Sequence, residues 1–408
     1  MQRFSENKLN GHYLYLDENN IPIILPCLFA RYTQRSLLSV NRAVEQNTKT
    51  GVSKELLIEI EIGEHTAYKI CNRLGIFLEY IDGYKENVFI SLNTHTALPS
   101  EVINDYVNDH LINEQGKSEE ATNKYVEAIN SYYNWLSYYF DNKPRYIGIK
   151  PSFREIARKN SKISLSVKYL LPATREVLYA NCNSLLQQVV LRNGGELGCR
   201  TSENQGFVLD DFRANKQKHS GLRSLFKQLK KNPHQEEFEY YLSSIWTKYG
   251  TSRTLYIPRH LLKLMCRYYD QERPKSTSPH LLVTNSNQNR GERIDTQFAS
   301  DTFLEVKNKV QQKINKNPKC YYDMQEIHLE HTYHVLRHSF GTDIFYSLCQ
   351  GQNKSYESIT TASAVYIETA RRLGHKVDGK GASEVTKRYI HACGYRDALQ
   401  KGVVDGFS

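Results

Sequence analysis

The chain has 408 residues, of which 39% are apolar, 24% charged and 11% aromatic. This length predicts two or three domains, since a domain usually holds about 100–200 residues. The 29 tyrosines and 15 phenylalanines favour packed structure and exclude an intrinsically disordered chain. The longest apolar run, residues 21–30, contains two prolines and is too short for a bilayer, which needs about 20 residues. No signal-peptide pattern follows Met1, so we expect a cytoplasmic protein without a membrane partner.

The balance of charge is basic. Lysine and arginine number 54 against 44 acidic residues, which gives a net charge of +10. Such an excess favours a polyanionic partner, most commonly nucleic acid, although a generally basic surface without a partner is the alternative. The eight cysteines are scattered singly, with no CxxC pair. This spacing excludes a zinc ribbon and a short-loop disulfide scaffold, and it is typical of a reducing compartment.

Two different patterns occupy the first part of the chain. Residues 1–50 alternate short apolar stretches with turn residues, which predicts strands and turns in a segment of unknown role. Apolar residues then recur at helical spacing through residues 51–142, which predicts a compact helical domain. The expected helices are 64–81, 99–115 and 118–140, the last with Ser118 as its N-cap.

Residues 143–169 break this period and are rich in lysine and arginine, so we expect an inter-domain linker. Its charge either follows a phosphate backbone or is simply solvated. A larger domain is predicted over 170–408, beginning with a helix that opens at Pro172 and runs to Val190. Alternating residues then indicate a hairpin with strands at 238–247 and 253–257, and the rest is mostly helical. The expected fold class is mainly α with a small β-hairpin.

The segment that starts at His334 carries the most chemical information. On a helix, His334 and Arg337 share a face, so both can address one group of ligand atoms. A cation beside a proton donor suits a phosphate oxygen. A surface helix with common polar residues is the alternative, because this motif alone is weakly specific.

Four further motifs strengthen the signal. Two precede the His334 segment: Gly198-Cys-Arg200-Thr-Ser-Glu203 and a lysine in the predicted hairpin, Lys248. Two follow it: Arg372-Leu-Gly-His375 and Thr386-Lys-Arg-Tyr389-Ile-His391. With these five elements the chain resembles the tyrosine recombinase family of site-specific DNA recombinases, the lambda integrase-like or phage integrase family. The resemblance covers about residues 170–392.

The resemblance implies a helical core-binding domain at 51–142 and a catalytic domain at 170–408, which together form a C-shaped clamp around duplex DNA. It implies DNA integration or transposition for a mobile genetic element, through a 3′-phosphotyrosine intermediate and without metal, cofactor or ATP. The implied partner is double-stranded DNA with inverted-repeat core sites. Assembly as a tetramer on two such sites, accessory proteins and association with the nucleoid are also implied.

Three of the implied catalytic residues handle the nucleophile and its protons. Tyr389 would attack the scissile phosphate, His334 would assist proton transfer at the tyrosine hydroxyl, and Lys248 would protonate the leaving 5′-oxygen. Tyr395 is a rival nucleophile, because residues 377–382 lengthen the spacing between the last two motifs. Tyr389 is preferred because its neighbours copy the family's local pattern.

The other three implied residues bind the phosphate. Arg200 and Arg337 would clamp its non-bridging oxygens, and His375 would donate a hydrogen bond to it. A metal site is the competing interpretation of the histidines at 328, 331 and 334, but no carboxylate completes a familiar zinc motif there. We therefore expect no metal, and ordinary polar roles for His328 and His331.

Some features leave alternatives open. The stretch 213–231 holds seven lysines and arginines and no acid, and is either an extra DNA-contacting segment or a solvated excursion. Two readings on the same fold remain, a type IB topoisomerase-like enzyme and a non-catalytic DNA-binding protein. A metal-dependent nuclease is a third reading, and it predicts loss of activity in EDTA.

Overall fold

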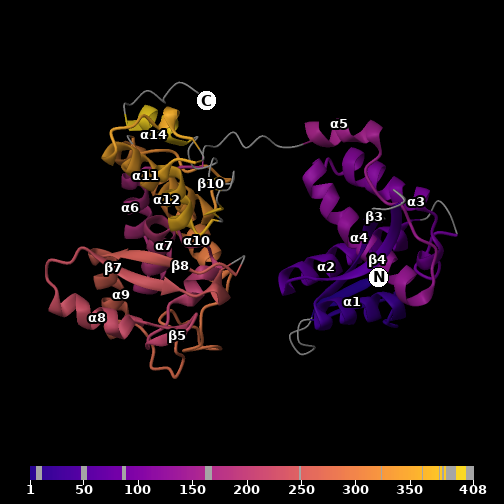
Figure 1. Cartoon of the computed structure of the whole chain (residues 1–408), viewed down its shortest axis with the longest axis horizontal. Coiled ribbons are helices and arrows are strands. Elements are labelled where there is room, and N and C mark those ends of the chain that lie inside the picture. The colour runs from indigo at the N-terminus through magenta and orange to yellow at the C-terminus, as the bar shows by residue number, and fades with distance from the viewer. Residues whose placement is uncertain are drawn as a thin grey trace. The chain divides into compact units, whose positions relative to one another are not determined.

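The computed structural model describes residues 1–5, 12–46, 53–84, 89–160, 168–247, 250–322, 324–360, 362–375, 377–378, 381–382 and 392–400. The chain divides into two compact units, Met1–Ile163 and Ser164–Ser408. Both are mainly helical, and every sheet of the described residues is a pair of antiparallel strands (Figure 1). The expected mainly α fold class is therefore confirmed. No helix in the described ranges combines the length and the apolar character that crossing a membrane requires.

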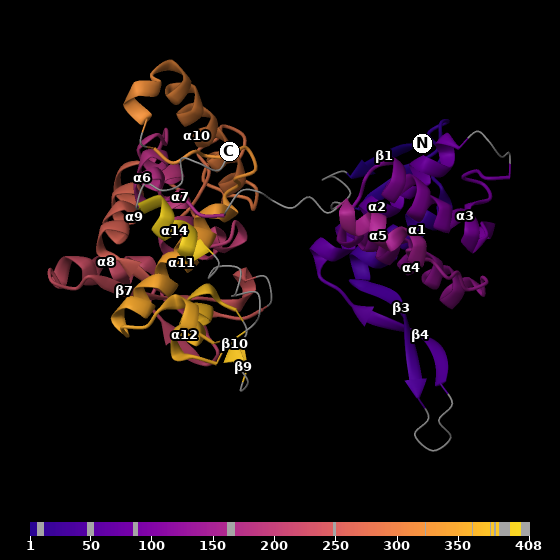
Figure 2. The ribbon, with the colours of Figure 1, turned by 90° about the horizontal axis from the view of Figure 1, so that it is seen from above.

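The first unit joins two hairpins to a group of helices. Its elements are β1 (Gln2–Ser5), β2 (Tyr13–Leu16), α1 (Ile24–Ser36), β3 (Leu38–Gln46), β4 (Ser53–Glu61), α2 (Glu64–Gly83), α3 (Ser100–Asp105), the π-helix η3 (Tyr106–Glu114), α4 (Glu119–Phe140) and α5 (Pro151–Lys159), with a short 3₁₀ turn η2 (His95–Ala97). Strands β3 and β4 pair from Leu38 opposite Glu61 to Gln46 opposite Ser53. Figure 2 shows this hairpin extending away from the helices of its unit.

The helices predicted over 64–81 and 118–140 are confirmed as α2 and α4, and the Ser118 hydroxyl accepts a hydrogen bond from Ala121 N at 3.3 Å. The helix predicted over 99–115 is divided into α3 and η3. Here the side-chain amide of Asn108 donates to Asn104 O at 2.6 Å. That carbonyl is the regular α-helical acceptor for the residue 108 N–H, so the side chain competes with the α-helical pattern.

Residues expected to flank the helical domain pack inside it. Phe29 of α1 and Tyr15 of β2 are fully buried in the same core as α2 and α4. Helix α1 forms where strands and turns were expected. Pro26 does not interrupt it, because the residue lies in the first helical turn, where its missing N–H costs no hydrogen bond. Within the expected basic linker, Ile147 and Ile149 also join this core.

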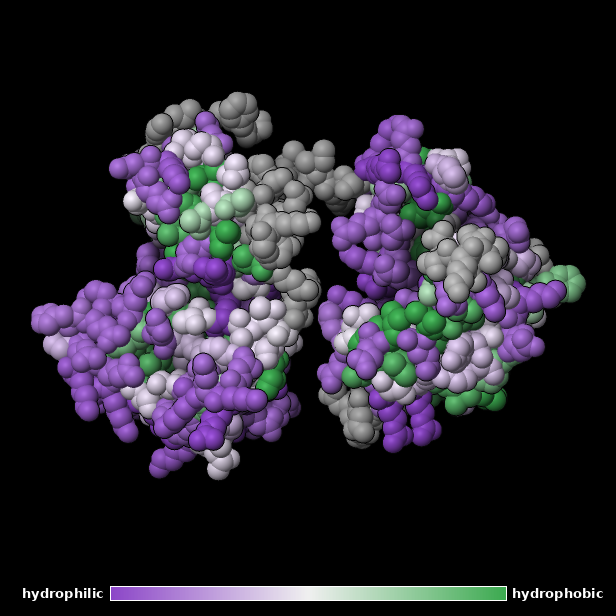
Figure 3. Space-filling model, in the orientation of Figure 1, coloured by the Kyte–Doolittle hydropathy of each residue, from purple (hydrophilic) through white to green (hydrophobic). Residues whose placement is uncertain are grey.

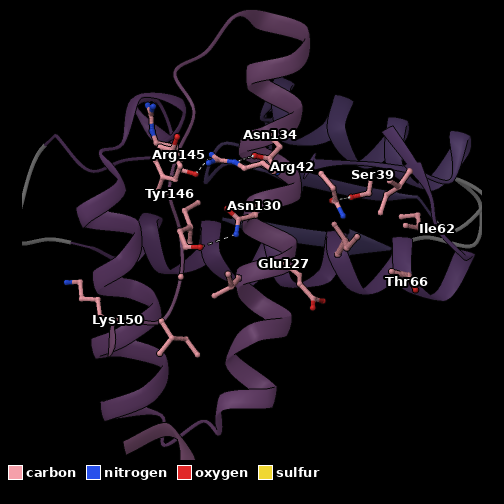
Figure 4. Close-up of a pocket in the computed structure, with 17 residues that line it drawn as sticks. Ser39, Arg42, Ile62, Thr66, Glu127, Asn130, Asn134, Arg145, Tyr146 and Lys150 are labelled. Carbon is pink, nitrogen blue, oxygen red and sulfur yellow. Dashed lines mark hydrogen bonds between the residues drawn. The ribbon is translucent and has the colours of Figure 1, made fainter. Parts of the chain in front are cut away.

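A groove of about 730 Å³ in this unit is lined by β3, α4 and the extended segment 145–150 (Figure 4). Arg42 donates from Nη2 to Arg145 O at 2.6 Å and from Nε to Asn134 Oδ1 at 3.3 Å. Asn130 Nδ2 donates to Ile147 O at 3.1 Å. These bonds hold the segment against α4, so it forms a wall of the first unit.

The second unit carries the motifs of the larger predicted domain. Its elements are α6 (Pro172–Ala180), α7 (Leu185–Leu197), β5 (Phe212–Ala214), β6 (Gln217–His219), α8 (Leu222–Lys231), β7 (Glu237–Leu242), β8 (Arg253–Pro258), α9 (Arg259–Gln271), α10 (Phe298–Lys316), α11 (His334–Gly351), α12 (Ala364–Leu373), β9 (Val377–Asp378), β10 (Gly381–Ala382) and α14 (Ala392–Gln400), with 3₁₀ turns η4 (Ser202–Gly206), η5 (Ser244–Trp246), η6 (Pro318–Tyr321) and η7 (Tyr356–Ser358).

The hairpin predicted near 238–257 is confirmed as β7 and β8, although β7 ends at Leu242, ahead of the expected Thr247. The single helix predicted from Pro172 to Val190 is two helices, α6 and α7. Ser184 begins the second one, because its hydroxyl accepts a hydrogen bond from Gln187 N at 3.1 Å.

Helices α7 and α11 lie in close contact, and a glycine makes this possible. A Cβ on Gly194 would lie 2.9 Å from the Tyr333 hydroxyl oxygen and 3.1 Å from Leu336 Cβ. Only a residue without a side chain leaves room for that approach. The contact brings the end of α7, with Gly198 and Arg200 after it, beside the first turns of α11, where Arg337 lies.

Candidate active site

Four charged side chains meet where α7, α11, α12 and β8 converge. Glu203, which is fully buried, accepts from Arg200 Nη1 at 2.5 Å and from Arg253 Nη2 at 2.7 Å. Arg337 Nη1 lies 3.6 Å from the same carboxylate. The Arg200 backbone N–H also donates to Glu203 Oε2 at 2.9 Å. One carboxylate therefore orients three guanidinium groups in the protein interior.

Arg337 is held from several directions. Its side chain is fully buried, and its terminal nitrogens donate to the carbonyls of Gly198 and Leu373. Nη2 also lies 3.3 Å from His375 Nε2. Gly198 is the left-handed C-cap of α7, with a φ of 62°. The ends of two helices thus converge on one arginine, so its direction is fixed before any ligand binds.

Arg253 is the member of this cluster that the sequence interpretation missed. Besides Glu203 it contacts Gly198 O at 3.2 Å and the carbonyl of Arg372. A Cβ on Gly374 would lie 2.8 Å from Arg253 Cδ, so the glycine of the Leu-Gly-His motif makes room for this arginine. The signal was present in the sequence, because the alternation of β8 puts a charged residue on the buried face of the hairpin.

The cluster has more positive than negative charge. Burial alone would raise the pKa of Glu203, but the positive charges of Arg253, Arg337 and Arg200 lower it to about 2. Glu203 is therefore ionised at neutral pH, and three guanidinium groups face one carboxylate. Two positive charges remain uncompensated within the cluster, and buried charge of this kind favours binding of an anion.

The two motif histidines are neutral at the same pH. Burial, and then the charges of Arg337 and Arg200, lowers the pKa of His334 to about 4. The same causes, with Arg253 in addition, lower the pKa of His375 to about 3. A neutral imidazole can accept a proton, which an imidazolium cannot. Nε2 of His375 lies 3.3 Å from Arg337 Nη2, which ties this imidazole to the guanidinium cluster.

These shifts predict a loss of stability in mild acid. Both histidines ionise near 6.5 when unfolded but only near 4 and 3 when folded, so the unfolded state binds more protons below pH 6.5. Stability falls as the pH drops from that value towards the folded pKa values. Between about pH 7 and about pH 5, protonation of His375 in the unfolded state should lower the free energy of unfolding by roughly 2 kcal/mol. The side chain of His334 is exposed, so solvent screens its shift and its contribution is smaller.

Urea unfolding followed by near-ultraviolet circular dichroism can measure this at both pH values. The double variant His334→Gln/His375→Gln should lose roughly 2–4 kcal/mol less than the wild type over that interval. His260 is a matched control, because its ion pair with Glu196 raises its pKa instead. Equal pH dependence in the wild type and the double variant would contradict the assignment of two histidines that stay neutral in the folded state.

Two predicted site residues, Lys248 and Tyr389, lie outside the described residues. Helix α14 begins three positions after the tyrosine and packs on α11. Arg396 Nε in α14 donates to Asp343 Oδ1 of α11 at 3.2 Å. The rival nucleophile Tyr395 lies in the same helix and is half-buried. The structure therefore brings together Arg200, His334, Arg337 and His375, and it fixes the helix that follows Tyr389.

His328 and His331 lie before α11, with ring centroids 5.2 Å apart. The Oε1 atom of Glu326 lies 4.0 Å from His328 Nδ1. Within the described ranges, no three side chains of the metal-binding types converge.

A groove of about 710 Å³ opens beside the cluster and runs along β8 and the end of α12. Arg253 and His375 line part of this groove, and Tyr241 of β7 and Tyr256 of β8 also line it. Arg372 stacks over the Tyr256 ring, with its guanidinium carbon 4.7 Å from the ring centroid. A ligand could therefore reach the cluster from a basic and aromatic surface.

No protein-family model matches the chain, and no curated protein matches its sequence. Solved structures do match. A XerA recombinase is 16% identical over 83% of this chain and 92% of its own, with a TM-score of 0.36. A Tn1549 transposon integrase in complex with transposon right end DNA is 10% identical over 93% of this chain and 99% of its own, with a TM-score of 0.49. A lambda integrase dimer bound to a core site is 11% identical over 95% of this chain and 94% of its own, with a TM-score of 0.40. These proteins are tyrosine recombinases.

Proposed function

We propose that this chain is a site-specific DNA recombinase that cleaves and rejoins DNA through a 3′-phosphotyrosine intermediate. The observation that carries the proposal is the buried cluster in which Arg200, Arg253 and Arg337 share the single carboxylate of Glu203. Its excess of two positive charges suits a phosphodiester, which carries one negative charge and gains a second in a phosphorane-like transition state. Fixed donors aimed at developing charge are commonly the largest catalytic contribution.

In this mechanism the Tyr389 hydroxyl oxygen attacks the scissile phosphorus. The bond from phosphorus to the 5′-oxygen breaks as the bond to tyrosine forms, so the phosphodiester linkage is conserved without ATP. His334, neutral at pH 7, accepts the tyrosine proton, and Lys248 donates a proton to the leaving 5′-oxygen. The same steps in reverse rejoin the DNA. The order of the five sequence motifs supports these roles.

The proposed substrate is double-stranded DNA with inverted-repeat core sites, as in the integration or transposition of a mobile element. Each protomer cuts one strand, so exchange between two duplexes requires four active sites and hence a tetramer on two DNA sites. Accessory proteins and a location on the nucleoid belong to the same proposal. The helical first unit would serve as the core-binding domain.

Covalent trapping on nicked suicide duplexes tests the proposal. The duplexes are made from repeats that flank the gene, incubated in EDTA and resolved on a denaturing gel. We expect a slow-migrating protein–DNA adduct with the wild type and none with Tyr389→Phe, because the variant lacks the attacking oxygen. Tyr395→Phe is the matched control and should still form the adduct.

The other outcomes point elsewhere. An adduct that survives Tyr389→Phe but not Tyr395→Phe would overturn the nucleophile. DNA binding without any adduct would favour a non-catalytic DNA-binding protein on this fold. Cleavage that EDTA abolishes would favour a metal-dependent nuclease. An adduct that leads only to relaxation of a single supercoiled duplex would favour a type IB topoisomerase-like enzyme.

A further inference from the structure

The short hairpin β5–β6 carries three cationic side chains. Arg213 and Lys218 are direct cross-strand partners, and Lys216 lies in the turn between the strands. All three are exposed, and Figure 3 shows a hydrophilic surface over β5 and α8. Lys218 lies 3.3 Å from Asp211, whereas Arg213 and Lys216 have no ion-pair partner in the part of the chain that the structure describes.

Two features of this hairpin are locally unfavourable. Like charges that face each other across an antiparallel pair repel, as Arg213 and Lys218 do here. The turn residues Asn215 and Lys216 have φ values of 50° and 64°, a geometry in which the second position favours glycine. A lysine there costs about 1 kcal/mol. Both costs would be offset by an anion that binds the hairpin from outside.

The hairpin is anchored to the strand that borders the active-site groove. The rings of His219 and Tyr241 stack with centroids 3.8 Å apart, and Asn215 Nδ2 donates to the Tyr241 hydroxyl at 2.8 Å. Tyr241 itself lines the groove that contains Arg253 and His375. The exposed cations of the hairpin thus adjoin the groove that leads to the guanidinium cluster.

We propose that the β5–β6 hairpin is a second contact for the phosphate backbone of duplex DNA, beyond the scissile phosphate. Arg213 and Lys216 each bind a phosphate of the same duplex whose cleavage the proposed function requires, so the inference rests on that function. The contact is sequence-independent, because lysine and arginine bind phosphates through charge. Of the two alternatives for the basic stretch 213–231, the proposal favours DNA contact for the part that forms this hairpin.

The decisive variant is Lys216→Gly. Glycine relieves the positive φ, so the melting temperature should stay equal or rise, while the loss of a cation should weaken DNA binding. A purely structural role for Lys216 predicts the opposite, a lower melting temperature and unchanged DNA binding. The double variant Arg213→Gln/Lys216→Gly removes both cations that lack an ion-pair partner. Lys313→Gln/Lys316→Gln is the matched control, because it removes two exposed lysines from the last turn of α10.

Fluorescence anisotropy of a labelled, arbitrary-sequence duplex of about 40 base pairs at several KCl concentrations measures the contacts. Each lost phosphate contact reduces the slope of log affinity against log salt by about 0.9. Between about 50 and about 150 mM KCl, the wild type should therefore lose roughly threefold more affinity than Lys216→Gly and sevenfold more than the double variant. The control should keep the wild-type slope.

The outcomes separate this inference from the proposed function. Wild-type slopes in Lys216→Gly and in the double variant would overturn the hairpin contact and leave the recombinase proposal intact. An equal decrease in the control would also overturn it, because the effect would then be general electrostatics. A wild type that does not bind duplex DNA at about 50 mM KCl would overturn the proposed function itself.

Discussion

Replacing Glu203 by glutamine is expected to destabilise the second unit by about 3–5 kcal/mol, since removal of one partner leaves uncompensated charge in the interior. Arg253 and Arg337 are 3% and 0% exposed, so water cannot replace the lost carboxylate. Urea unfolding at neutral pH measures the loss. Asp210→Asn is the matched control. Asp210 and its partner Arg223 are 68% and 46% exposed, so the replacement should cost about 1 kcal/mol or less.

The same variant should change how steeply the free energy of unfolding decreases at acidic pH. Glu203 ionises near 4.5 when unfolded and near 2 when folded, so its contribution of about 3 kcal/mol is present above pH 4.5. That contribution is lost as the pH falls through 2. Glu203→Gln should therefore show a smaller decrease of stability over this window than the wild type. Wild-type stability and an unchanged decrease at acidic pH in the variant would contradict the charge arrangement.

The second large effect is expected on cleavage. Arg200→Gln should slow adduct formation on suicide duplexes about 10²–10³-fold, a loss of about 3–4 kcal/mol of transition-state stabilisation. At 17% exposure, Arg200 is the member of the three-arginine cluster most accessible to a phosphate. The rate is measured at saturating DNA, so that a change in affinity does not contribute.

Arg192→Gln provides the comparison for this prediction. Arg192 lies on α7 upstream of the site and pairs with Glu176 at 2.6 Å, so its loss removes an arginine from the same region without touching the cluster. Its cleavage rate should match that of the wild type. If Arg200→Gln cleaves as fast as Arg192→Gln, Arg200 does not bind the scissile phosphate.

Local pattern was sufficient for several elements. The long apolar stripes of α2 and α4 and the alternation of β8 are short-range signals, so these elements could be predicted near their observed bounds. The pair His334 and Arg337 was predicted from helical spacing, and Arg200 and His375 were predicted from the resemblance that the ordered motifs carry. The convergence of Arg200, Arg253 and Arg337 on the carboxylate of Glu203 is a property of the folded chain.

What the sequence by itself determined is the mainly α fold class, the principal helices, the hairpin and the chemical types of the candidate site. Only the tertiary structure decided that segments near Tyr15 and Ile147 belong to the first core, that Arg253 is a third buried guanidinium, and that two histidines are neutral. The physical reason is the separation along the chain of the residues that interact. Helical and strand periods arise from neighbours along the chain, whereas burial, ion pairing and pKa depend on groups that meet only after folding.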